Sequence, residues 1–238
     1  MVNFLTKKKA IIFDFDGTLA DTVGIWNEID QLTIKELSGK NVTLQTIQTD
    51  RENFINSHNH GKVYENYTSF LMEKYNIKKD LDDVISRRRT IALDFIINRI
   101  DYKENSAEVL KRLKQLGYTL VLATTTARRT IDIYNTKNQN LIQKAKLDET
   151  FDYIICNDEV TEKKPSPQIY QKSLEILKLN KEDCLVVEDS IEGVLAAKRA
   201  GIEVLNIPDS YSKSNQNEIN KLSDYKIKNF TEFLKLLN

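Results

Sequence analysis

Two aspartates separated by one residue stand near the start of the chain, in the segment Phe13-Asp14-Phe15-Asp16-Gly17-Thr18-Leu19. Residues two apart in extended backbone point to the same side, so Asp14 and Asp16 can face one site. Neighbouring carboxylates repel each other unless a cation joins them, and Mg²⁺ prefers oxygen ligands of this kind. The pair therefore predicts a metal site, although a plain turn at the end of a strand would also use Asp and Gly.

A hydroxyl group follows a second apolar run. Thr124 comes directly after Leu120-Val121-Leu122-Ala123. Its hydroxyl and the adjacent backbone amides could hydrogen-bond an anion, and Thr125 or Thr126 could share this role. The alternative interpretation is a β-branched triplet that merely ends a strand.

A lysine stands just before a predicted helix, in the segment Lys163-Lys164-Pro165-Ser166-Pro167. A fixed ammonium group at Lys164 could neutralise a nearby carboxylate and an anionic ligand together. Lys163 is interpreted as its solvent-facing neighbour. Ser166 and Pro167 are expected as the N-cap and the first residue of the helix.

An acidic pair, Glu188-Asp189, follows the apolar run Leu185-Val186-Val187 and precedes Ser190. Carboxylates at this place could bind a metal ion, and Asp189 or Ser190 could also cap the helix that follows. The two roles are compatible. The sequence therefore offers four groups of polar residues, each at the end of an apolar run.

Strands must position these groups. Apolar runs bounded by turn residues predict buried strands at residues 10–13, 118–123, 151–156, 184–187 and 202–207. Helical segments are predicted at residues 106–116, 166–178 and 190–200, and a short strand and a helix at the C-terminus. This alternation is typical of an α/β fold with a doubly wound parallel sheet, whose strands all end at one edge.

Residues 21–99 follow a different pattern, because apolar residues recur there at helical spacing without an intervening strand. We expect a helical domain at 21–99, inserted into a Rossmann-like core formed by 1–20 and 100–238. His58 and His60 are expected in a loop of this insertion rather than in a metal site.

The four groups, taken in order, resemble the motifs of the haloacid dehalogenase superfamily. The match is to its helical-capped phosphatases, including the β-phosphoglucomutase-like and phosphoglycolate phosphatase-like members. It covers about residues 8–22 and 100–210, whereas the insertion matches only in position and type. The resemblance implies Mg²⁺-dependent hydrolysis of a small phosphomonoester, such as a sugar phosphate or a phosphoglycolate-like compound, through an aspartyl-phosphate.

The resemblance also implies a role for each residue. Asp14 would attack phosphorus, and Asp16 would protonate the leaving oxygen and later activate water. The residues expected to contact the substrate are Phe15, Thr124, Thr125 and Lys164. The residues expected to bind Mg²⁺ are Asp14, Asp16, Asp189 and Glu188, and the acidic pair itself leaves open which of its two carboxylates touches the metal.

Two other functions fit parts of the pattern. Phosphosugar mutases of the β-phosphoglucomutase type tend to have Val after Asp-Gly and a His on the first cap helix, where this chain has Thr18 and Trp26. A catalytically idle protein that only binds a phosphometabolite would have no need of the complete set Asp14, Asp16, Thr124, Lys164 and Asp189. Dehalogenases lack the second aspartate. Hydrolysis of a phosphate ester is therefore the favoured function.

The composition limits the partners. The 35 basic and 35 acidic residues give a formal net charge of zero, which argues against nucleic acid and leaves a small phosphorylated metabolite as the expected partner. Cys156 and Cys184 each lie in an apolar run, which predicts buried free thiols and a reducing compartment. No apolar stretch approaches the ~20 residues of a membrane span, so we expect no membrane contact and a cytoplasmic location.

Overall fold

The computed structural model describes residues 3–57, 63–209 and 215–237. The chain forms two compact units. The core unit comprises Met1–Val23 and Ile97–Asn238, and the helical unit comprises Gly24–Ile96. His58 and His60 lie outside the described residues.

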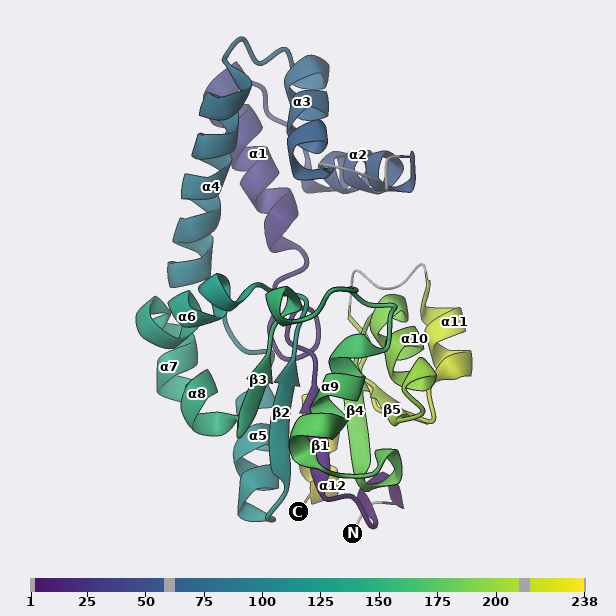
Figure 1. Ribbon diagram of the computed structural model, residues 1–238. Coiled ribbons are helices and arrows are strands. Elements are labelled where there is room, and N and C mark those ends of the chain that lie inside the picture. Colours follow the sequence, from purple (N-terminus) through teal and green to yellow (C-terminus); the bar gives the residue numbers. More distant parts are fainter. Residues whose placement is uncertain (1–2, 58–62, 210–214, 238) are drawn as a thin grey trace. The chain divides into compact units, whose positions relative to one another are not determined.

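A six-stranded sheet forms the centre of the core unit (Figure 1). Its strands are β1 (Ala10–Phe13), β2 (Thr119–Ala123), β3 (Tyr153–Ile155), β4 (Cys184–Glu188), β5 (Glu203–Asn206) and β6 (Tyr225–Lys226). Their order is β3-β2-β1-β4-β5-β6, and every neighbouring pair is parallel. The predicted doubly wound parallel sheet is confirmed.

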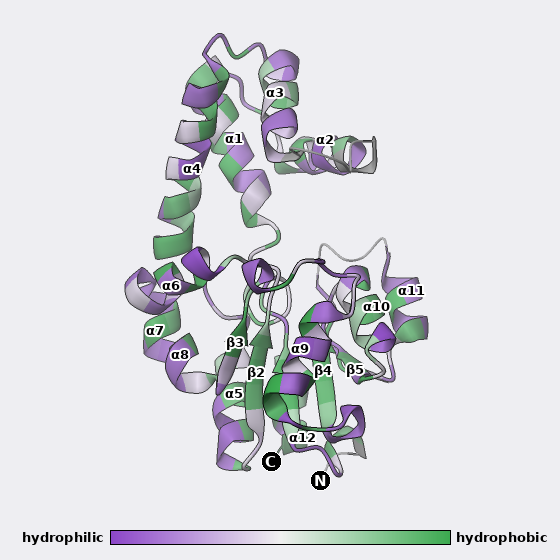
Figure 2. Cartoon of the chain, in the orientation of Figure 1, coloured by the Kyte–Doolittle hydropathy of each residue, from purple (hydrophilic) through white to green (hydrophobic). Residues whose placement is uncertain are grey.

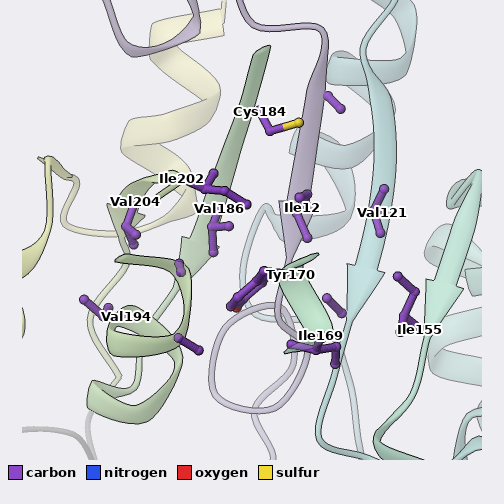
Figure 3. Packing of buried hydrophobic residues seen from close by; sticks show 14 of the residues in the cluster. Ile12, Val121, Ile155, Ile169, Tyr170, Cys184, Val186, Val194, Ile202 and Val204 are labelled. Atoms are coloured by element: carbon purple, nitrogen blue, oxygen red, sulfur yellow. The ribbon is translucent and has the colours of Figure 1, made fainter. Parts of the chain in front are cut away.

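Helices cover both faces of this sheet (Figure 1). Those of the core unit are α5 (Ser106–Gln115), α6 (Arg128–Lys137), α7 (Gln139–Ala145), α8 (Leu147–Thr150), α9 (Gln168–Leu177), α10 (Ile191–Arg199), α11 (Gln216–Leu222) and α12 (Phe230–Leu237). On one face, α9 and α10 pack against the strands through Ile169, Tyr170 and Val194 (Figure 3). On the other face, α5 packs against α12 and β2.

The central strands are buried from end to end, because helices cover them on both sides. All four residues of β1 and all five of β4 are inaccessible to solvent. Such strands consist of continuous apolar runs rather than alternating ones. Figure 2 shows this as predominantly green strands, whereas the surrounding helices carry both colours. Cys156 and Cys184 are buried and free, as predicted.

Four helices account for the insertion, and each contributes to the helical unit: α1 (Ile25–Ser38), α2 (Leu44–Ser57), α3 (Val63–Tyr75) and α4 (Leu81–Asn98). An apolar cluster that includes Ile34, Ile47, Leu71 and Val84 joins them. No helix among the described residues is long and apolar enough to cross a bilayer.

Some predicted boundaries were wrong. Helix α9 begins at Gln168 with Pro167 as its N-cap, so Ser166 lies one residue before the cap. Helix α5 ends at Gln115, one residue before the predicted end, and Leu116 is 44% exposed. Gly117 follows with a φ of 86°, the left-handed conformation expected of a residue that ends a helix.

Candidate active site

The predicted polar residues meet at the carboxyl edge of the sheet. Asp14 directly follows β1, Thr124 follows β2, and Glu188 is the last residue of β4. Strand β1 pairs with both β2 and β4, and the order of the sheet reverses at this strand. In open parallel sheets, ligands bind in the crevice outside the carboxyl ends of the strands at such a point.

Three buried carboxylates lie together here. Asp14, Glu188 and Asp189 each offer an oxygen atom, and these atoms lie within 4.8 Å of one another. All three residues are buried, and the exposed fraction of none exceeds 6%. The structure thus brings three of the four predicted metal-binding side chains into one cluster of carboxylates.

Lys164 lies against this cluster. Its ammonium Nζ donates to Asp14 Oδ1 and to Glu188 Oε1, both at 2.7 Å, and to the carbonyl oxygen of Ala123 at 3.1 Å. Three N–H groups therefore have three acceptors. The neighbouring Lys163 is exposed, as predicted.

Glu188 accepts hydrogen bonds at both carboxylate oxygens. Oε1 accepts from Lys164 and, at 3.0 Å, from the hydroxyl of Tyr170. Oε2 accepts from the backbone amides of Asp189 and Ser190 at 3.0 and 3.2 Å, and from the hydroxyl of Ser190 at 3.0 Å. The side chain is fully buried, so these contacts define its position.

Two glycines allow the acidic side chains to approach the backbone. A Cβ atom built on Gly193, in the first turn of α10, would lie 1.7 Å from Glu188 Oε1. A Cβ atom on Gly17 would lie 2.5 Å from Asp189 Oδ2, and Gly17 also has a φ of +83°. Neither site tolerates a side chain. Thr18, next to Gly17, donates its hydroxyl to Asp189 Oδ1 at 2.7 Å.

The Asp16 side chain is not part of the carboxylate cluster. Its Oδ2 accepts hydrogen bonds from the hydroxyl groups of Thr126 and, at 3.5 Å, of Thr124. The backbone amide of Thr126 donates in turn to Thr124 Oγ1 at 3.0 Å. Strand β1 ends at Phe13, so the extended backbone on which a shared direction of Asp14 and Asp16 was predicted does not continue to Asp16.

Two residues expected to contact substrate have different environments. Phe15 is fully buried, and its ring packs on Tyr134 with a centroid distance of 5.2 Å. Its side chain therefore contributes to the core rather than to a surface that a ligand could reach. Thr125, between the two threonines that bind Asp16, is exposed.

Residues 11–207 match the family described as haloacid dehalogenase-like hydrolase. The chain belongs to this family. Protein CbbY of Rhodobacter capsulatus is 26% identical over 222 residues, which cover 86% of this chain and 87% of CbbY. Pyrophosphatase PpaX of Bacillus cereus is 28% identical over 197 residues, which cover 80% and 79% of the two chains.

Solved structures agree with this assignment. The crystal structure of a proposed beta-phosphoglucomutase from Thermotoga maritima matches with a TM-score of 0.78 and 27% identity, covering 96% of this chain and 98% of that chain. The predicted membership of the haloacid dehalogenase superfamily, drawn from four short motifs, is confirmed.

The electrostatics of this haloacid dehalogenase-like site favour a cation. Burial raises the pKa of Asp14 above its usual range, Lys164 opposes this effect, and the carboxylates of Glu188, Asp189 and Asp16 add to it. Burial and the charge of Glu188 raise the pKa of Asp189 to about 7, although the Thr18 hydrogen bond acts in the opposite direction. Lys164 supplies one positive charge against three carboxylates, so the cluster keeps a negative excess.

The donor set fits Mg²⁺, because all of its ligand atoms are carboxylate oxygens and Mg²⁺ is a hard cation. The raised pKa of Asp189 expresses the cost of burying negative charge without a matching cation. A divalent ion would remove that cost.

Several residues of this haloacid dehalogenase-like site were not predicted from the sequence. Thr126 was named only as a residue that could share the role of Thr124, and Tyr170 and Gly193 were not predicted as site residues. For Gly193 and Tyr170, the sequence does contain a feature that could have identified them. A glycine inside a helix costs about 1 kcal/mol relative to alanine, so Gly193 indicates a close approach. Tyr170 lies on an apolar helix face, where its hydroxyl requires a partner.

Proposed function

We propose that this protein is a Mg²⁺-dependent phosphatase that hydrolyses a small phosphomonoester through an aspartyl-phosphate on Asp14. The observation that carries the proposal is that two neighbouring carboxylates, Asp14 and Asp16, have different environments. Asp14 is held by Lys164 beside two further carboxylates. Asp16 is held apart from them by the hydroxyls of two threonines. Such a pair suits a nucleophile and a separate acid–base group.

In the first step, a carboxylate oxygen of Asp14 attacks phosphorus, and the bond from phosphorus to the ester oxygen breaks. Asp16 transfers a proton to that oxygen as it leaves. Lys164, already 2.7 Å from Asp14 Oδ1, places its positive charge where the phosphoryl oxygens gather negative charge. The backbone amides that follow Thr124 could hydrogen-bond the same oxygens.

In the second step, water attacks the phosphorus of the aspartyl-phosphate, and Asp16 accepts a proton from that water. The bond to Asp14 breaks, phosphate leaves, and both carboxyl groups return to their starting state. The carboxylate cluster would hold Mg²⁺, which supplies charge neutralisation between Asp14 and the phosphoryl group when it is bound.

The substrate is proposed to be a small phosphorylated metabolite, with residues 21–99 acting as the cap that selects it and 1–20 with 100–238 as the catalytic core. The match to a proposed beta-phosphoglucomutase favours phosphosugar transfer as the second candidate. Thr18 stands against it, because mutases of that type tend to have Val at this position. The similarity to a pyrophosphatase adds pyrophosphate to the candidate substrates.

The test of the proposal is phosphate release from a panel of sugar phosphates, phosphoglycolate and pyrophosphate. We expect release from at least one compound with Mg²⁺ and none with a chelator. Conversion of one sugar phosphate to its isomer without phosphate release would instead establish the mutase. Binding without any turnover would establish the idle binding protein.

The affinity for Mg²⁺ is predicted to rise with pH. Asp189 has a pKa of about 7 without metal, so below that pH the ion must displace a proton from it. We expect the dissociation constant to fall about fivefold from pH 6 to pH 7, about tenfold from pH 6 to pH 8, and to level off above pH 8. Calorimetric titration of chelator-treated protein in two buffers of different ionisation enthalpy measures both the affinity and the released proton.

The Asp189 carboxyl group also affects the folding stability of the protein. Its pKa is raised in the folded protein relative to about 3.9 in the unfolded chain, so without metal its contribution to stability declines as pH rises from about 4 to 7. The rise in melting temperature on adding Mg²⁺ should therefore be larger at pH 8 than at pH 6. An equal rise at both values would contradict the role of Asp189.

A further inference from the structure

Tyr170 connects the apolar core to the charged site. It lies in the first turn of α9 and is fully buried, and its ring packs among the apolar side chains of the core (Figure 3). Its hydroxyl donates to Glu188 Oε1 at 3.0 Å. The ring centroid lies 5.0 Å from Lys164 Nζ, within the range of a cation–π contact. One side chain thus contacts both members of the Lys164–Glu188 ion pair.

The hydrogen bond from Tyr170 completes the set of donors to Glu188. A carboxylate offers about four lone-pair sites, and Glu188 accepts from Lys164, Tyr170, two backbone amides and the hydroxyl of Ser190. Gly193 lies so close to Oε1 that the carboxylate has no space to move in that direction. Direct coordination of a metal by Glu188 would require at least one of these hydrogen bonds to break.

Lys164 has its own three acceptors, and they differ in what the reaction demands of them. Asp14 must be able to bond to phosphorus, whereas Glu188 and the Ala123 carbonyl can remain fixed. A fixed Glu188 therefore holds the ammonium group in place while its contact with Asp14 changes. Losing the Tyr170 hydroxyl would leave Glu188 Oε1 with Lys164 alone, and the ammonium would shift toward Glu188.

We propose that Tyr170 is a positioning residue, whose hydroxyl fixes Glu188 as the anchor of Lys164 and so keeps this carboxylate from turning toward the metal. Only the expected kinetic effect of changing Tyr170 rests on the proposed phosphatase function. Two carboxylates suffice for Mg²⁺, which usually keeps several waters and binds to one or two carboxylates together with substrate phosphate.

The test compares Tyr170→Phe with Ser173→Ala. Both changes remove one buried hydroxyl from α9, but the hydroxyl of Ser173 donates only to the carbonyl of Ile169 in the same helix. For Tyr170→Phe we expect kcat to fall about tenfold, the loss expected for one hydrogen bond to a charged group, with KM within threefold of wild type. Ser173→Ala should leave both constants unchanged.

Two further measurements need no turnover. Calorimetric titration of chelator-treated protein with Mg²⁺ should give a dissociation constant for Tyr170→Phe within about threefold of wild type, and one weakened at least tenfold for Asp189→Asn. The Cε–Hε NMR signal of Lys164, assigned by its absence from Lys164→Met, should shift in Tyr170→Phe and not in Ser173→Ala.

Three results would overturn the proposal. They are an unchanged Lys164 signal in Tyr170→Phe, equal kinetic losses in both hydroxyl variants, and a loss of Mg²⁺ affinity in Tyr170→Phe as large as that in Asp189→Asn. The last would make Glu188 a direct ligand. If the wild type released no phosphate from any ester, the phosphatase proposal would fail, whereas the titration and the NMR signal would still decide the role of Tyr170.

Discussion

Asp14→Asn is expected to reduce phosphate release by at least about a thousandfold while the protein stays folded. The amide nitrogen and oxygen are poor nucleophiles, so no aspartyl-phosphate can form. The change also replaces a buried carboxylate whose pKa is already raised by burial, so it relieves charge repulsion as well as removing the contact with Lys164. Folding should therefore survive, and circular dichroism with the initial rate on the best substrate of the panel measures both effects.

The matched control is Asp132→Asn, on the exposed surface of α6 in the same unit. We expect wild-type activity from it. Residual turnover of Asp14→Asn above about one per cent of wild type, in protein shown to be free of deamidation, would show that another group attacks phosphorus.

Lys164→Met is expected to affect activity and metal binding in opposite directions. Turnover should fall about 10²- to 10³-fold, because the positive charge beside the phosphoryl oxygens is lost. The affinity for Mg²⁺ should rise, by about tenfold or more, because a cation adjacent to the site no longer repels the ion. Initial rates at saturating Mg²⁺ and calorimetric titration without substrate separate the two effects.

Stability without metal should also decrease in Lys164→Met. Removal of one partner from a buried ion pair leaves uncompensated charge, and such changes cost about 3–5 kcal/mol, which added Mg²⁺ should partly restore. Lys163→Met is the control, because the adjacent lysine is exposed and should change none of the three quantities by more than a small factor. Weaker Mg²⁺ binding in Lys164→Met would contradict the arrangement described here.

The sequence predicted the parts of the site that depend on strand ends. Asp14, Thr124 and the acidic pair each follow a continuous apolar run, and in a parallel sheet such runs end at one edge. Lys164 was located by its proline-rich segment before a helix. These positions follow from local patterns and one rule of topology, which is why they could be identified without coordinates.

The orientation of side chains within the site was harder to predict from the sequence. The direction of Asp16 depends on where β1 ends and on the left-handed turn at Gly17, and neither is encoded by alternation of apolar residues. The contact of Tyr170 with Glu188 joins residues 18 positions apart on a helix and a strand. Such contacts are set by packing, which a sequence pattern does not specify.

Helices α6, α7, α8 and α11 of the core unit were not predicted, for a different reason. Helix α6 has only Ile131 and Tyr134 as buried residues, so its apolar stripe is too short to be recognised. Helix α7 begins at Gln139, and its N-cap is Asn138, whose buried side chain accepts a hydrogen bond from the backbone amide of Leu141. Polar caps and short helices lack the periodicity on which the prediction relied.

The central claim is that Asp14 carries the phosphoryl group during turnover. The most direct measurement is mass spectrometry of peptides from enzyme quenched in acid within the first turnovers, with substrate and Mg²⁺ present. We predict that the peptide containing Asp14 gains the mass of one phosphoryl group, and that this species is absent from Asp14→Asn and from samples with chelator. Turnover without this species, under conditions in which a synthetic acyl phosphate survives, or a phosphoryl group on a different residue, would contradict the account.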